Sequence, residues 1–203
     1  YWRRIFKSGN CLLQRTGNEN FAAGQPYVVM SNHGSLIDIP ALMGTVPGSL
    51  RMVMKEELTK VPVWGQALVA SGFVPVDRKN RDKAIAQLEK AKQMLSKGVS
   101  VWVSPEGTRS RDGKLAPFKK GGFHVAKDLG VPIIPAWIEG ASDVLPPDSF
   151  VVRYDGTCTV SFGAPIATVG KTVDSLMTDV RAQILALSGK ADEVDAAVVA
   201  KAA

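Results

Sequence analysis

A histidine and an aspartate five residues apart, His33 and Asp38, are the side chains of this sequence best suited to acid–base chemistry. An imidazole that is held by a carboxylate at one ring nitrogen can accept a proton at the other, as a general base does. The five-residue offset lets a loop turn bring the carboxylate back to Nδ1 of His33. The pair therefore predicts deprotonation of an alcohol, and the structural alternative is an exposed histidine with Asp38 capping a helix near Pro40.

Ser35 lies between these two residues and offers a hydroxyl nucleophile. A Ser-x-x-Asp run before apolar residues is also a capping pattern, so we expect Ser35 to stabilise a turn. His124 and Asp128 form a superficially similar pair, but a spacing of four within a predicted helix is typical of a surface pair.

A second set of useful side chains occurs in the segment 104–110, Ser-Pro-Glu-Gly-Thr-Arg-Ser. Pro105 and Gly107 favour a tight turn. From such a turn, Glu106 could bind a hydroxyl group and Arg109 could bind phosphate oxygens. The segment suits a polyol phosphate, and the alternative is an ordinary turn with an exposed ion pair.

Two further cations, Lys55 and Arg78, stand just past the ends of apolar runs. Each alone is more typical of a structural ion pair or a solvated helix start than of a site. Together with Arg109 they follow three separate predicted strands, and His33 follows a fourth. Because the carboxyl ends of parallel strands meet at one edge of a sheet, the four positions predict a single phosphate-binding active site.

The elements that position these residues are short apolar runs alternating with helical patterns, which is typical of an α/β fold. The helix over 81–97 has Asn80 as its N-cap and Gly98 as its stop, and a second helix spans 173–187. We predict one domain with strands over 27–30, 50–54, 73–76, 99–103, 131–137 and 157–162.

Composition agrees with one globular domain: 203 residues, 45% of them hydrophobic and 22% charged. The formal net charge is +6, and basic residues gather near the N-terminus and in the segment 109–120. Such clusters suit phosphate esters, an acidic membrane surface or nucleic acid. No nucleic-acid module or interleaved stacking aromatics accompany them, so lipid phosphate fits better and we expect no nucleic-acid partner.

Several other site types lack sequence support. There is no GxxxxGK[ST] or GxGxxG run, and two histidines with two distant cysteines do not form a zinc pattern. The cysteines, Cys11 and Cys158, predict no disulfide framework and a reducing compartment.

The chain shows no internal repeat and no linker, so we divide it by composition alone. We expect a basic amphipathic segment over 1–20, a main domain over 21–189 and an Ala-rich tail over 190–203. The first segment suits a membrane surface or a solvated helix end, because aromatic and apolar side chains alternate with cations there: Trp2, Arg3, Arg4, Ile5, Phe6 and Lys7. No run of about 18 apolar residues occurs. The chain starts at Tyr1, which leaves open a preceding anchor or targeting signal that is absent from it.

Four blocks in strict order resemble the glycerolipid acyltransferases, and within them the 1-acylglycerol-3-phosphate (lysophosphatidate) acyltransferases. Residues 32–38 are similar to the NHxSxxD block, which contains an HX4D motif, 72–78 to a GxxxxDR-type block, 104–110 to FPEGTRS and 131–136 to a VPIxPV-type block. Lys55 with Leu58, Pro62 and Gly65 also matches the family. Gly34, Ser104 and Ala136 depart from the pattern, and none of these departures removes a titratable group. Four blocks in register are far more specific than any one of them.

The resemblance implies a mixed, mostly parallel sheet flanked by helices, and transfer of a fatty acyl group from acyl-CoA or acyl-carrier protein to lysophosphatidic acid, giving phosphatidic acid. It implies no metal or prosthetic group, and a membrane-associated enzyme with its active site on the cytoplasmic side. It gives His33 the role of base and Asp38 that of its orienting partner. The remaining roles it implies are phosphate binding by Lys55, Arg78 and Arg109, and positioning of the acceptor's glycerol by Glu106, Gly107 and Thr108. The oligomeric state stays open.

Other functions remain open from the sequence. The acceptor could be glycerol 3-phosphate, a lysophospholipid or an amino-acid lysolipid, and the tafazzin-like variant would transfer acyl groups from intact phospholipid. A non-catalytic lipid-binding protein of the same fold is the alternative from another class, and the intact pair of His33 and Asp38 argues against it. A hydrolase that uses Ser35 fits least well.

Overall fold

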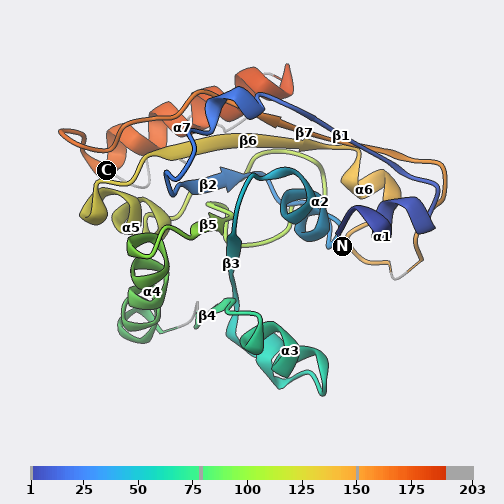
Figure 1. Ribbon diagram of the computed structural model, residues 1–203, viewed down its shortest axis with the longest axis horizontal. Coiled ribbons are helices and arrows are strands. Elements are labelled where there is room, and N and C mark those ends of the chain that lie inside the picture. Colours follow the sequence, from blue (N-terminus) through green and yellow to red (C-terminus); the bar gives the residue numbers. More distant parts are fainter. Residues whose placement is uncertain (1, 78–79, 150, 191–203) are drawn as a thin grey trace.

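A computed structural model describes residues 2–77, 80–149 and 151–190 of the chain. Its centre is one sheet of seven strands (Figure 1), namely β1 Leu12–Thr16, β2 Val28–Ser31, β3 Leu50–Lys55, β4 Val74–Val76, β5 Ser100–Val103, β6 Ile133–Glu139 and β7 Thr157–Phe162. The strand order is β1-β7-β6-β2-β5-β3-β4. All neighbours pair in parallel except β6 and β7, so the predicted mixed, mostly parallel sheet is confirmed.

The helices cover both faces of the sheet (Figure 1): α1 Trp2–Ser8, α2 Asp38–Thr45, α3 Trp64–Ala70, α4 Arg81–Ser96, α5 Gly121–Leu129, α6 Ala141–Val144 and α7 Val173–Ser188, with short 3-10 turns at η1 Asn18–Asn20 and η2 Glu56–Lys60. One face packs against α1, α2 and α6, and the other packs against α4, α5 and α7. The alternation of side chains along each strand divides the core between these faces. In β2, for example, Val29 joins the first core, whereas Val28 and Met30 join the second.

Both helices predicted in detail are present, and a side chain caps the start of each. The Asn80 side chain accepts a hydrogen bond from the Lys83 backbone N–H at 3.0 Å at the start of α4. Thr172 accepts one from the Ser175 N–H at 3.1 Å at the start of α7. These caps satisfy backbone donors that the first turn of a helix leaves unpaired.

Strand β1 is the strand that the sequence analysis did not predict. Four of its five side chains are exposed, so the strand carries no apolar alternation. It is held by parallel backbone pairing with β7, from Leu12 opposite Thr157 to Thr16 opposite Ser161. The sheet therefore begins at Leu12, inside the segment 1–20 that composition had set apart. Of the predicted tail, residues 191–203 lie outside the described residues.

Candidate active site

The predicted site residues follow strands that are neighbours in the sheet. Strands β2, β5, β3 and β4 are adjacent and parallel, so the segments that follow them leave the sheet at the same edge. With about 4.8 Å between neighbouring strands, the exit of β5 lies about 5 Å from that of β2, and the exit of β3 about 10 Å from it. The sheet thus orders these loops outward from His33: the segment 104–110 first, then Lys55, then the end of β4.

His33 and Asp38 meet as their spacing predicts. Nδ1 of His33 lies 2.8 Å from Oδ2 of Asp38. The Asp38 side chain is 1% exposed and that of His33 17% exposed, so the carboxylate is sealed while the imidazole still reaches solvent. With Nδ1 engaged by the carboxylate, Nε2 is the ring nitrogen left for a substrate proton. The arrangement is that of an oriented general base.

Asp38 also organises the loop that carries His33. Its Oδ2 accepts hydrogen bonds from the backbone N–H groups of Gly34 at 2.8 Å and Ser35 at 2.9 Å. Ser35 is fully buried; its hydroxyl donates to Leu145 O at 2.6 Å and accepts from Ile37 N at 3.1 Å. The turn-stabilising role predicted for Ser35 is confirmed, and a buried hydroxyl with both partners within the fold is poorly placed to act as a nucleophile.

Two contacts fix the His33 loop against the neighbouring strands. The Asn32 side-chain amide pairs with both backbone groups of Ile138 in β6, donating to its O at 2.9 Å and accepting from its N–H at 2.8 Å. The ring of Trp102 in β5 meets the His33 imidazole edge to face, with 5.5 Å between centroids. These contacts limit how far the imidazole can move, as preorganisation of a candidate base requires.

Segment 104–110 lies directly against His33. Ser110 N–H donates to His33 O at 2.7 Å, and His33 N–H donates to Oε1 of Glu106 at 3.2 Å. Glu106 is 3% exposed, and its Oε2 accepts from Ala116 N–H at 2.9 Å. Burial raises the pKa of Glu106, although these two N–H groups act to lower it. The predicted contact of Glu106 with glycerol stays a prediction, because the described contacts of its carboxylate are with backbone donors.

The remaining residues of this segment are more open. Gly107 has φ of +72°, a left-handed conformation that glycine adopts without strain, and a Cβ there would meet the Lys119 side chain at 2.9 Å. Thr108 is exposed. Arg109 is half-buried and donates from its guanidinium to Pro147 O at 2.6 Å, which ties the segment to the loop before β7.

Lys55, the cation past β3, lies farther along the same edge. The ammonium of Lys55 is half-exposed and lies 3.3 Å from the Glu57 carboxylate. Arg78 lies outside the described residues. The segments that follow β3 and β4 are joined through Lys83 of α4, whose ammonium lies 2.8 Å from Glu56 and 3.7 Å from Asp77.

A cavity of about 120 Å³ adjoins the imidazole of His33. Sequence reasoning missed several residues of its wall, among them Lys114, Trp137, Glu139 and Lys190. Lys114 belongs to the basic run after Arg109, which offered a signal for it. The other three had none, because the cavity forms only when β6 and the end of α7 come beside the His33 loop.

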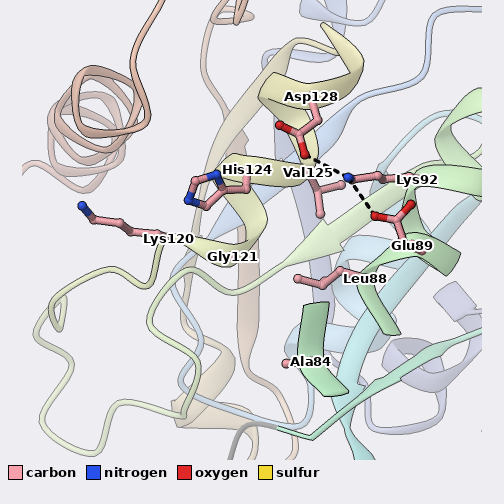
Figure 2. A pocket seen from close by; sticks show the side chains of 9 residues that line it. All are labelled: Ala84, Leu88, Glu89, Lys92, Lys120, Gly121, His124, Val125 and Asp128. Carbon is pink, nitrogen blue, oxygen red and sulfur yellow. Dashed lines mark hydrogen bonds and ion pairs between the residues drawn. The ribbon is translucent and has the colours of Figure 1, made fainter. Parts of the chain in front are cut away.

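A larger pocket, of about 520 Å³, lies between α4 and α5 and is separate from this site. Figure 2 shows Lys92 of α4 placed between Glu89 and Asp128, with its ammonium 2.8 Å from each carboxylate. Asp128 is thus paired with Lys92 on the neighbouring helix, as suits the predicted surface role. Among the described site residues, none lines this pocket.

Three further findings concern the described residues. They contain no group of three or more His, Cys, Asp or Glu side chains placed to hold a metal ion. Among them, no helix has the length and apolar character needed to cross a bilayer. Cys11 and Cys158 are both buried free thiols.

Comparison with known proteins gives consistent matches. The Acyltransferase family model matches residues 13–139. The 1-acyl-sn-glycerol-3-phosphate acyltransferase alpha of Mus musculus is 37% identical over 161 residues, which is 79% of this chain and 56% of the relative. The chloroplastic 1-acyl-sn-glycerol-3-phosphate acyltransferase BAT2 of Brassica napus is 35% identical over 169 residues, which is 83% of this chain and 48% of the relative. The crystal structure of the 1-acyl-sn-glycerophosphate (LPA) acyltransferase PlsC from Thermotoga maritima superposes with a TM-score of 0.79 at 28% identity, covering 95% of this chain and 79% of that one.

The chain spans about half the length of the curated relatives it matches. The matched region runs from β1 to the end of β6, and it includes the loop of His33 and Asp38 and the segment 104–110. Because the family model covers more than half of the sequence and the fold agrees with that of a solved relative, this chain belongs to the Acyltransferase family.

Proposed function

We propose that this protein transfers a fatty acyl group from a thioester to the free hydroxyl of lysophosphatidic acid, giving phosphatidic acid. The observation that carries the proposal is the 2.8 Å contact of His33 Nδ1 with Asp38, beside a cavity that the imidazole lines. The names of the similar relatives support the choice of acceptor. The thioester donor is a co-substrate, so the reaction needs no prosthetic group.

In the proposed reaction, Nε2 of His33 accepts the proton of the acceptor hydroxyl while the hydroxyl oxygen attacks the carbonyl carbon of the thioester. The negatively charged Asp38 stabilises the imidazolium that forms. Collapse of the tetrahedral intermediate breaks the carbon–sulfur bond, and the imidazolium returns its proton to the departing thiolate. The acyl group thus moves directly from sulfur to oxygen, without an acyl-enzyme, and backbone N–H groups near segment 104–110 are proposed to stabilise the oxyanion.

Acceptor binding is proposed for the residues outward from His33. Arg109 is the leading phosphate ligand because its segment leaves the strand next to β2, and its planar guanidinium suits a phosphate. Lys55 and Arg78 are proposed to add positive charge farther along the edge. Gly107 and Thr108 are proposed to face the glycerol. Both acyl-CoA and acyl-carrier protein fit the proposal as donors.

We also propose that the protein works at an anionic membrane surface. Helix α1 exposes Arg4, Ile5 and Lys7. Beside it, where Asp155 N–H bonds to Gly9 O at 3.3 Å, the segment 151–154 exposes further apolar side chains, with Tyr154 70% exposed. Apolar side chains mixed with cations favour binding to acidic headgroups. Sedimentation with phosphatidylglycerol vesicles but not with phosphatidylcholine vesicles would support this, and equal binding to both would contradict it.

The test of the proposed activity is release of free thiol from an acyl thioester in mixed micelles, with and without lysophosphatidic acid. The thioesters are palmitoyl-CoA, oleoyl-CoA and acyl-carrier protein loaded with a fatty acyl group. Acceptor-dependent release, with phosphatidic acid identified as product, is the expected result. A parallel panel of glycerol 3-phosphate, lysophospholipids and amino-acid lysolipids tests the acceptor. Release without any acceptor would indicate a thioesterase, and a preference for an acceptor that lacks phosphate would refute the role of Arg109.

A further inference from the structure

The backbone of His33 is held on both sides by the segment that follows β5. Its carbonyl accepts from Ser110 N–H at 2.7 Å, and its N–H donates to Glu106 Oε1 at 3.2 Å. These bonds act on the main chain and add to the contact of the imidazole with Asp38. A base that is fixed before substrate binds needs little reorganisation during the reaction.

Glu106 links this backbone to a second segment. Its other oxygen, Oε2, accepts from Ala116 N–H at 2.9 Å, so one carboxylate bridges residues that are far apart in sequence. The side chain is 3% exposed, and its burial raises the pKa of the carboxyl. Burying a carboxyl group costs desolvation and by itself is weak evidence of a contribution to stability, and in some proteins such groups serve to fix one arrangement of a site.

The chain of contacts continues to α7. The Arg181 guanidinium donates to Ala116 O at 3.0 Å and to Leu115 O at 2.9 Å, and lies over the Phe118 ring, 5.4 Å from its centroid. Ala116 is therefore held at its N–H by Glu106 and at its carbonyl by Arg181. The positive charge of Arg181 also acts to lower the pKa of Glu106, against the effect of burial. Helix α7 packs on the face of the sheet opposite to α2, which carries Asp38 (Figure 1).

We propose that Glu106 and Arg181 are positioning residues that act through Ala116 and the backbone of His33 to hold the imidazole in place. The inference rests on the proposed function, because it takes His33 as the base. It assigns a role to Arg181, which lies outside the four sequence blocks and outside the cavity wall. It also gives Glu106 an action through His33 in place of contact with the acceptor.

The experiment compares Glu106→Gln, Arg181→Met and their double variant with the wild-type protein. Lys171→Met is the matched control. Lys171 pairs with Asp179 of α7 at 2.6 Å, so this substitution also removes a cation that contacts the fold, but away from the contacts of Glu106 and Arg181. The readouts are kcat and KM for lysophosphatidic acid, the thermal midpoint, and NMR of the imidazole groups. The sequence has two histidines, so His124 is an internal reference for the His33 resonances.

We expect Glu106→Gln to lower kcat by about 10–100-fold, since an amide can accept from only one of the two N–H groups and a small displacement of a base is costly. Arg181→Met should lower kcat by about 3–30-fold. In both variants KM should stay within about threefold of wild type, and the His33 resonances should shift or broaden while those of His124 do not. The kcat of the double variant should be about that of Glu106→Gln alone, because the two side chains act on His33 through the same contacts. Lys171→Met should match wild type.

A rise in KM with kcat retained in Glu106→Gln would overturn the proposal in favour of direct contact with the acceptor. Unchanged His33 resonances in both single variants would overturn it whatever the activity, so it can fail independently of the proposed function. If Glu106→Gln does not fold, the kcat and the His33 resonances of Arg181→Met and Arg181→Lys test the positioning role. Arg181→Lys keeps the positive charge but not the paired hydrogen bonds from two guanidinium nitrogens to Ala116 O and Leu115 O. We expect its activity to lie between that of wild type and that of Arg181→Met.

Discussion

Replacing Asp38 with asparagine isolates the charge that the proposed base depends on. All three hydrogen bonds to the Asp38 side chain reach the same oxygen, Oδ2, from His33 Nδ1, Gly34 N and Ser35 N at 2.8–2.9 Å. An asparagine with its carbonyl oxygen at that position keeps these bonds, so the turn and the imidazole tautomer survive. What is lost is the attraction between the carboxylate and the imidazolium that forms when His33 takes the proton.

The size of that loss follows from the geometry. With charge centres about 4 Å apart and an effective dielectric constant of about 20, the attraction is about 4 kcal/mol. Because each 1.36 kcal/mol corresponds to a factor of ten, Asp38→Asn should lower kcat by about 10²–10³-fold. Steady-state phosphatidic acid formation measures this, with the thermal midpoint as control for folding. A variant that folds normally and keeps kcat within about threefold of wild type would refute the role given to Asp38.

Three further predictions test other features of the structure. Ser35→Ala removes a buried hydroxyl with two backbone partners, so the free energy of unfolding should fall by about 1–3 kcal/mol while activity per folded molecule is largely kept; chemical denaturation and activity together check this, and detection of an acyl group on Ser35 would contradict it. Burial raises the pKa of Cys158 to about 12, so iodoacetamide at pH 8 should label that thiol only on unfolding; labelling of the native protein at the rate of an exposed thiol would be inconsistent. The raised pKa of Glu106 means that the folded protein binds this proton more tightly than the unfolded chain, so the stability that protonation adds is lost as the pH rises from 4.5 through the folded pKa. The thermal midpoint of wild type minus that of Glu106→Gln should accordingly be larger at pH 4.5 than at pH 7.5. A difference that grows as the pH rises would contradict a raised pKa of Glu106.

The sequence predicted much of the fold because most elements carry a strong local signal. The buried strands β2 and β6 read as apolar runs, and the predicted cap Asn80 stands where α4 begins. Strand β1 gave no such signal, since an edge strand held by backbone pairing does not need apolar side chains.

The candidate site was predictable where a few neighbouring residues make it. His33 and Asp38 lie within one loop, so their spacing alone indicated contact. The contact of Glu106 with His33 joins residues 73 apart in sequence, and that of Arg181 with Ala116 joins residues 65 apart. Only the packing of α7 and of the segment around Ala116 against the loop after β5 brings them together, and no local pattern reports that.

In the proposed reaction, His33 is the base of an acyl transfer to lysophosphatidic acid. Phosphatidic acid formation by wild type and by His33→Ala, measured side by side in the same mixed micelles, tests it most directly. A positioned base contributes about 10²–10⁴-fold, so turnover by a folded His33→Ala should fall by about that factor, with no acyl-enzyme in either protein. Turnover close to that of wild type in folded His33→Ala would show that His33 is not the base.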